Sequence, residues 1–308
     1  MTLLIAGALG IDAEGLIAGA GGLASIAAAP LASVQLWSRG GALAEHPREI
    51  LSRRQIDLSG VTWDGAVPVF GADGRESTPV GTSLGSCEPT SADGLRAVLV
   101  VGLAPAEEVQ ALRAARALKA PILIVASSTQ LDPLKGVVVR SGQPSRRVAS
   151  AIATTDDGDD ANDGDEGAHA EEDGIDVRIE TLASALRLTG TSDALAAAKA
   201  LQAAGAKAVV LTTGMLGGLL VFGDRAVSFP VQAIPETLGQ RGAFAAFAGA
   251  LAGWCEGAGA NYTALMRGCT TAGVVAGFQV QGGVKRLLGA DRAQYLERFN
   301  RLRRLAKS

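Results

Sequence analysis

Apolar runs alternate with amphipathic stretches along the first 140 residues. Four short apolar runs are typical of buried strands and cover residues 3–6, 33–37, 97–101 and 122–125. The stretches between them predict helices over residues 22–31, 47–54 and 105–118. This alternation predicts a parallel sheet covered by helices.

The last third of the chain continues the pattern with a strand over residues 208–211. A hairpin is predicted from 219–222 and 226–229, joined across Gly223 and Asp224. Stretches rich in small residues predict helices over residues 191–204, 243–255 and 261–278, and a basic stretch predicts a final helix over 292–305. We expect Thr191 or Ser192 to lie near the N-cap of the first of these helices.

Two segments break the alternation. Residues 60–82 are rich in Gly and Thr, and together with roughly 10–20 they predict a small lid of antiparallel strands. Residues 154–174 hold many acids and no large apolar group, so we expect a disordered acidic insert within a single domain spanning 1–308. The acids do not fit the spacing of an EF-hand calcium loop.

Charge is distributed unevenly along the 308 residues. The net charge is −3, but residues 156–173 contain ten acids and no Lys or Arg. The remaining chain has 21 acids against 28 Lys and Arg residues, so it is positive by about 7 charges. A positive body suits anionic ligands such as nucleotides, and arginines scattered over the surface are the alternative explanation.

Composition narrows the class of protein further. The chain is 48% apolar, which supports a packed core, but only 4% aromatic, and its 40 glycines suit helices packed closely on a sheet. Cys87, Cys255 and Cys269 are too few and too scattered for a disulfide framework or a zinc site, so we expect a reducing cytoplasm. We expect no membrane span and no nucleic-acid partner.

A glycine-rich stretch opens the predicted helix at 243. Residues 236–244 read Glu-Thr-Leu-Gly-Gln-Arg-Gly-Ala-Phe and follow a strand, a Thr-x-Gly turn and a hairpin. This order resembles the phosphate-binding half of ribokinase-like (PfkB-type) sugar kinases, whose loop reads Asp-Thr-x-Gly-Ala-Gly-Asp-Ala-Phe. The resemblance implies a three-layer α/β/α sandwich with a mainly parallel central sheet and a small β lid.

Further matches to the same family lie along the chain in order. The run that precedes the lid strands in the family resembles residues 55–61. The family's LTG motif resembles the end of residues 183–190, and its closing helices resemble residues 273–288. The resemblance implies substrate contacts at Asp12, Gly21 and Gly22, and nucleotide contacts at Thr213, Gly214 and Gly217. It also implies ATP and Mg²⁺ as cofactors and a sugar, nucleoside or nucleotide as ligand. For each of these glycines, the alternative to ligand contact is a role in packing or in a turn. For Asp12 the alternative is a role in a turn.

The loop departs from the family at the residues that perform chemistry. An anion hole is implied at Gly239, Gln240, Arg241 and Gly242. Gly242 stands where the family has its catalytic Asp, and Arg241 replaces a glycine that lets the phosphate approach the backbone. Loss of a general base typically costs about 10²- to 10⁴-fold in rate. The sequence therefore predicts no catalytic residue at this position.

A second departure concerns the metal. The family's Asn-x-x-Glu run, which organises magnesium and phosphate, falls on Thr181 and Ser184. Glu180 is adjacent, but we do not expect it to substitute, because metal binding needs oxygens at defined positions. We therefore expect no metal site.

Three hypotheses follow for the function. The first is a pseudokinase that keeps the fold and a ligand pocket but transfers phosphate slowly or not at all. The second is an active carbohydrate kinase with a relocated base, for which Asp12 and Glu236 are the candidates. The third is an interaction protein that forms a homodimer through the lid or binds an active relative.

Overall fold

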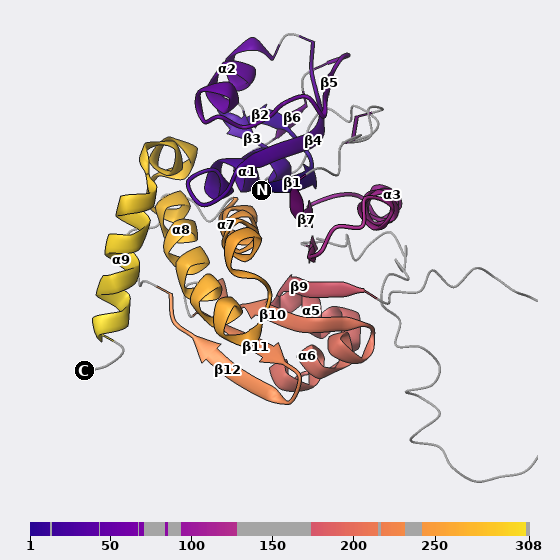
Figure 1. Cartoon of the computed structure of the whole chain (residues 1–308), viewed down its shortest axis with the longest axis vertical. Helices are drawn as coiled ribbons and strands as arrows, with labels where there is room; N and C mark the ends of the chain where they lie inside the picture. Colours follow the sequence, from indigo (N-terminus) through magenta and orange to yellow (C-terminus); the bar gives the residue numbers. More distant parts are fainter. Residues whose placement is uncertain are drawn as a thin grey trace, which may run out of the picture.

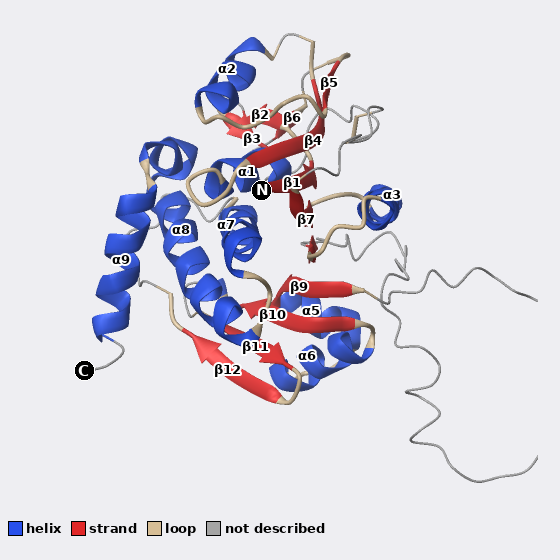
Figure 2. Ribbon diagram, viewed as in Figure 1, coloured by secondary structure: helices blue, strands red, loops and turns tan. Residues whose placement is uncertain are grey.

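The computed structural model describes residues 1–12, 14–42, 44–66, 68–70, 84–85, 94–127, 174–214, 217–231 and 242–305. Within them a nine-stranded sheet forms the centre of the molecule (Figures 1 and 2). Its strands, from one edge to the other, are β12 (Arg225–Phe229), β11 (Gly218–Phe222), β10 (Ala206–Thr212), β9 (Ile175–Thr181), β8 (Leu123–Ser127), β7 (Leu95–Val101), β1 (Thr2–Gly7), β4 (Val34–Gly40) and β5 (Val61–Trp63). The pairs β10–β11 and β11–β12 are antiparallel, and the other pairs are parallel.

Helices cover both faces of this sheet. They are α1 (Ala20–Ala28), α2 (Glu45–Arg53), α3 (Pro105–Ala117), α5 (Leu182–Thr189), α6 (Ala194–Ala203), α7 (Ala243–Ala258), α8 (Tyr262–Gly289) and α9 (Arg292–Leu305). One core cluster lies between the sheet and α1, α7 and α8, and a second lies between the sheet and α3, α5 and α6. The predicted three-layer α/β/α sandwich with a mainly parallel sheet is therefore confirmed.

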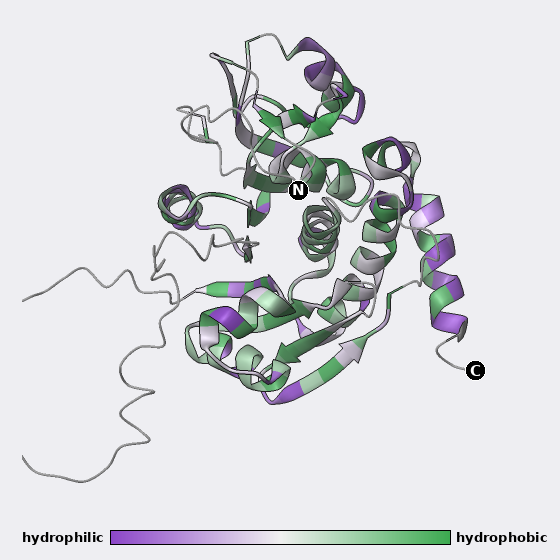
Figure 3. Cartoon of the chain, turned by 180° about the vertical axis from the view of Figure 1, so that it is seen from behind, coloured by the Kyte–Doolittle hydropathy of each residue, from purple (hydrophilic) through white to green (hydrophobic). Residues whose placement is uncertain are grey.

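The central strands are apolar because both of their faces are buried. In β7, for example, Leu99 and Val101 join the α7 side of the core, while Val98 and Val100 join the α3 side. Figure 3 shows the same distribution, with hydrophobic strands in the middle and hydrophilic stripes on α2 and α9.

Small residues let α1 and α7 approach each other closely. A Cβ atom built at Gly249 of α7 would overlap the backbone of Ala24 in α1, and one at Gly253 would lie 3.2 Å from the Ala28 carbonyl oxygen. Glycine is required at 249 because any side chain would separate the two helices. This contact fixes the position of the first turn of α7 relative to α1.

A second, three-stranded sheet lies over the amino-terminal half of the large one. It consists of β3 (Ile17–Ala18), β2 (Gly10–Asp12) and β6 (Val69–Phe70). The antiparallel excursion predicted for 60–82 is wrong in its described part, because β6 pairs parallel with β2 and β5 joins the main sheet parallel to β4. Residues 71–82 and 154–173 lie outside the described residues, so the acidic insert stays a prediction.

The structure refines the cap of one helix, extends another and adds a strand. Asp193, and not Thr191 or Ser192, caps α6, because its Oδ1 accepts a hydrogen bond from the Ala196 amide at 2.7 Å. Helix α8 does not end at 278 but continues across a kink at Gly282 and Gly283. Strand β9 was not predicted. None of the helices within the described residues is long and apolar enough to cross a membrane.

Candidate ligand site at the start of helix α7

Gly242 forms the first corner of α7. Its φ angle is +73°, a conformation that favours glycine, and its carbonyl oxygen accepts a hydrogen bond from the Ala246 amide at 2.8 Å. Among the described residues no side chain caps this end of the helix. The amides of the first turn and the positive end of the helix dipole are therefore available to an anion. The other predicted anion-hole residues, Gly239, Gln240 and Arg241, lie outside the described residues.

Leu23 and Gln279 occupy the space beside Gly242. A Cβ atom built at 242 would overlap Cδ1 of Leu23 from α1 and would lie 3.2 Å from Nε2 of Gln279 from α8. Both neighbours are uncharged, and Leu23 is 8% exposed. An aspartate at 242 would meet backbone strain at this positive φ, and the end of the Leu23 side chain would have to move. The sequence analysis missed Leu23 and Gln279, because neither has a side chain typical of catalysis.

Glu236 and Glu256 are the acids nearest to position 242 in the sequence. Glu236 lies outside the described residues. Glu256 is buried on α7 itself, but it lies 14 residues further along the helix, which corresponds to about 21 Å at 1.5 Å per residue. Glu256 therefore cannot reach a ligand at the start of α7.

Asp12 is held in a turn at the end of β2. Its Oδ1 accepts hydrogen bonds from the amides of Glu14 and Leu16, each at 2.9 Å. The same turn is connected to α8, because Glu14 Oε2 lies 3.9 Å from Lys285 Nζ. These contacts give Asp12 the turn role that the sequence left open, and one carboxylate oxygen is already engaged.

Gly21 and Gly22 form the first turn of α1. Their amides donate to the Ala8 carbonyl oxygen at 2.8 and 3.2 Å. A Cβ at Gly21 would overlap the Gly7 backbone, and a Cβ at Gly22 would lie 2.9 Å from a methyl carbon of Leu9. The pair therefore lets α1 pack directly on the end of β1, the packing role that was the alternative to ligand contact.

Thr213, Gly214 and Gly217 form a turn between β10 and β11. The amide and the hydroxyl of Thr213 both donate to the Gly217 carbonyl oxygen, each at 2.9 Å. Gly214 and Gly217 have φ angles of +65° and +95°. Backbone geometry therefore explains these glycines, and the predicted nucleotide contact stays a prediction.

The end of β9 does not supply a magnesium site. Thr181 caps α5, accepting a hydrogen bond at its Oγ1 from the Ser184 amide at 3.1 Å. Glu180 is completely buried and pairs with Arg178, with Nη2 and Oε1 at 3.2 Å. Because Val177 and Ile179 face the α7 side, the alternating Arg178 and Glu180 face the α3 and α5 side. Glu180 thus points away from the start of α7.

The buried Arg178–Glu180 pair is a feature that sequence reasoning missed. Burial raises the pKa of Glu180 to about 7, although the Arg178 guanidinium and a hydrogen bond with Ser184 lower it. Its second oxygen, Oε2, has no hydrogen-bond partner. The sequence signal that could have indicated this pair is the presence of two opposite charges at alternate positions of an otherwise apolar run.

No group of three or more His, Cys, Asp or Glu residues that could hold a metal ion occurs within the part of the chain that the structure describes. Cys255 and Cys269 are buried free thiols, and burial raises the pKa of Cys255 to about 12. The start of α7 offers backbone amides that suit an anion, and the absence of a metal site stays a prediction.

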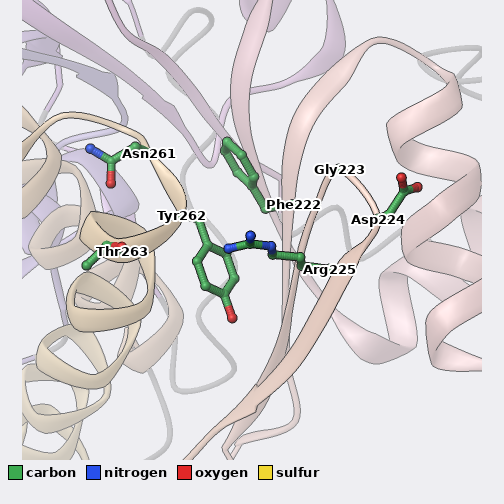
Figure 4. Close-up of a pocket in the computed structure, with 7 residues that line it drawn as sticks. All are labelled: Phe222, Gly223, Asp224, Arg225, Asn261, Tyr262 and Thr263. Atoms are coloured by element: carbon green, nitrogen blue, oxygen red, sulfur yellow. The ribbon is translucent and has the colours of Figure 1, made fainter.

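A surface hollow of about 560 Å³ lies elsewhere, at the tip of the β11–β12 hairpin (Figure 4). Arg225 stacks on Tyr262 there, with its Cζ 5.0 Å from the ring centroid. Phe222 beside it pairs with Ala208 near the start of β10, whereas Thr212 at the other end leads into the 213–217 turn. The hollow therefore lies at the opposite end of the strands from the 213–217 turn.

Comparison with known proteins identifies the fold. No protein-family model matches the sequence, and no curated protein sequence matches it. Solved structures match over nearly the whole chain, and the fold is that of ribokinase-like carbohydrate kinases.

Three of these structures illustrate the likeness. Ribokinase from Cryptococcus neoformans var. grubii in complex with ADP has a TM-score of 0.69 at 17% identity, covering 96% of this chain and 99% of that one. Aminoimidazole riboside kinase from Salmonella enterica, complexed with aminoimidazole riboside and an ATP analogue, has a TM-score of 0.68 at 14% identity. The match covers 97% of this chain and 99% of that one. Fructokinase from Vibrio cholerae, bound to fructose, ADP and calcium, has a TM-score of 0.67 at 14% identity. The match covers 96% of this chain and 98% of that one.

Proposed function

We propose that this chain is a degenerate carbohydrate kinase, a pseudokinase that keeps a small-molecule site but transfers phosphate slowly or not at all. One observation supports the proposal above the others. At the start of α7, where the resemblance implies a catalytic aspartate, Gly242 is enclosed by Leu23 and Gln279.

Phosphoryl transfer needs alignment of the two substrates, neutralisation of phosphate charge and a proton acceptor beside the attacking hydroxyl. The uncapped amides of α7 serve the second need, because they and the helix dipole attract phosphate oxygens. Leu23 and Gln279 cannot serve the third, because neither side chain accepts a proton near neutral pH. The chain therefore retains an anion-binding element without the base.

The ligands we propose are a nucleotide and a sugar or nucleoside. ATP would place its phosphates at the α7 amides and would supply the transferable phosphoryl group. No residue is assigned to Mg²⁺, since Thr181 and Ser184 engage each other in the α5 cap and Glu180 points to the opposite face.

Binding and transfer should be measured on the same preparation. We expect ATP or ADP to raise the melting temperature, because a ligand that binds the native state stabilises it. We expect a panel of sugars and nucleosides to show little phosphate transfer from ATP. Absence of any nucleotide-induced shift would contradict the retained site, and rapid transfer would contradict the loss of chemistry.

The hypothesis of a relocated base has its own test. Asp12 already accepts two backbone hydrogen bonds at Oδ1, so the test is made on Glu236, the other candidate. If transfer is detected, Glu236→Gln should abolish it under this hypothesis. Unchanged transfer in Glu236→Gln would remove Glu236 from consideration.

Pairing through the small sheet remains a separate proposal. The sheet β3-β2-β6 contains only short strands, which another copy could extend. Light scattering should then report a dimer at micromolar concentration. A monomer at all concentrations would contradict pairing without affecting the pseudokinase proposal.

A further inference from the structure

The hollow at the tip of the β11–β12 hairpin presents a guanidinium beside two aromatic rings (Figure 4). Arg225 is exposed, and its Cζ lies 5.0 Å from the centroid of the Tyr262 ring. The centroid of the Phe222 ring is 6.3 Å from the same point, at an interplanar angle of 57°. The Tyr262 ring therefore holds the guanidinium at the hollow, where its N–H groups can meet an oxyanion.

Two polar residues at the start of α8 line the same hollow. Asn261 caps the helix, because its Oδ1 accepts a hydrogen bond from the Ala264 amide at 3.0 Å. Its NH₂ group is therefore the part of the side chain that can donate to a ligand. Thr263 is exposed and adds a hydroxyl. Guanidinium, amide and hydroxyl donors together suit a carboxylate.

The hollow contains one acid, Asp224, whose charge is balanced on another side. Figure 4 shows its carboxylate turned away from Arg225 and Tyr262. Lys199 of α6 lies 3.7 Å from Asp224 Oδ1 and donates a hydrogen bond to the Gly223 carbonyl oxygen at 2.7 Å. Arg225 has no ion pair within the part of the chain that the structure describes, so the hollow keeps a positive charge.

The acidic insert, residues 154–174, rejoins the fold at the same end of the sheet. It ends directly before Ile175, the first residue of β9, which pairs with Ala206 at the start of β10. Ala208 of β10 pairs in turn with Phe222, the last residue of β11. The start of β9 and the hairpin tip are therefore two strand spacings apart, which is about 10 Å (Figure 1).

The acids closest to β9 are near enough to reach the hollow. Glu171, Glu172 and Asp173 stand just before the strand, and three extended residues span about 10 Å. The insert holds ten acids and no Lys or Arg, whereas the rest of the chain is positive by about 7 charges. Because the insert has no large apolar group, its carboxylates are the groups through which it can bind a surface.

We propose that the hollow is a docking site for the acidic insert of the same chain, in which a carboxylate of the insert pairs with Arg225. A guanidinium binds a carboxylate through two parallel N–H groups, and the Tyr262 ring orients it for this contact. Asn261 and Thr263 supply the neighbouring donors. The proposal depends on the hollow and not on the start of α7, so it is independent of the proposed pseudokinase function.

Limited digestion of the full chain with a glutamate-specific protease tests this docking. Mass spectrometry measures the rates of cleavage after Glu166, Glu171 and Glu172, each divided by the rate for a free peptide of the same sequence in the same buffer. Arg225→Gln should raise these relative rates about two- to fivefold, the range that one surface ion pair contributes. Arg303→Gln, at an exposed position on α9, is the matched control and should keep the wild-type rates.

Salt and charge reversal sharpen the test. About 0.5 M sodium chloride should raise the relative rates of the wild type toward those of Arg225→Gln, because salt screens exposed charges. Arg225→Glu should raise them further than Arg225→Gln, and circular dichroism checks that each variant is folded. Equal relative rates in the wild type, Arg225→Gln and Arg303→Gln would overturn the proposal. Protection that grows with protein concentration would also overturn it, because the occupant would then be the insert of a second copy.

Discussion

Gly242 and Leu23 are the residues on which the functional account depends. Under the proposed function, Gly242 stands where a base would be needed, and the Leu23 side chain from another helix occupies the space beside it. An aspartate at 242 would therefore require the Leu23 side chain to shift. The pair should behave as one energetic unit, because the two sites are in contact.

Gly242→Asp should lower the free energy of unfolding by about 2 kcal/mol or more, because it adds strain at a positive φ and an overlap with Leu23. Leu23→Ala alone should also destabilise the fold through a cavity. In the double variant the loss should be smaller than the sum of the two by about 1 kcal/mol. Urea denaturation of the four proteins measures this coupling, and additive losses would contradict the predicted contact.

Glu180 makes stability depend on pH. Its folded pKa of about 7 lies above the ordinary value of 4.5, so the native state holds a proton that the unfolded state releases between these values. Stability is therefore highest below about pH 4.5 as far as this group is concerned. The unfolding free energy falls as pH rises from about 4.5 to about 7, by at most about 1.4 kcal/mol per pH unit, and this contribution is constant above that range.

Glu180→Gln should remove this contribution, so the unfolding free energy should change less between about pH 5 and about pH 7. Denaturant titrations at several pH values measure the slope. Glu49→Gln, an exposed glutamate on α2, is the control that should keep the wild-type slope. An identical slope in Glu180→Gln and wild type would show that Glu180 does not titrate in this range.

At the scale of elements, the sequence was informative wherever an element had a continuous apolar pattern. Residues 97–101 and 208–211 fall within β7 and β10 as the structure has them. Strand β9 was not predicted because Arg178 and Glu180 interrupt its apolar run. These two side chains can be buried because they pair with each other. The α8 kink could not be predicted from helical periodicity, since the pattern of small residues continues through it.

The contact between α1 and α7 gives a prediction at this scale. Gly249→Ala should lower the unfolding free energy by about 1–3 kcal/mol, because the new methyl group overlaps the Ala24 backbone. Gly257→Ala lies on the same helix with no atom within 4 Å of the new Cβ, and it should stabilise the helix by about 0.5–1 kcal/mol. Thermal unfolding compares the two. Equal effects would contradict close packing at 249.

For the whole molecule, the ordered set of motifs was enough to predict the three-layer architecture, since each motif fixes a strand end or a helix start. The candidate site was predictable only in part. Gly242 stands at the start of α7 as expected, but the roles of Asp12, Gly21 and Thr213 depend on backbone contacts that no sequence pattern reveals. Leu23 and Gln279 approach Gly242 only through folding.

The most direct test of impaired chemistry is the turnover number with saturating ATP, magnesium and the acceptor that gives the largest thermal shift. Ordinary enzymes turn over at about 1–10³ per second, and loss of a base lowers this by about 10²- to 10⁴-fold. We predict a turnover number of about 0.1 per second or less. A value above about 1 per second would contradict the account and indicate a working kinase whose base lies elsewhere.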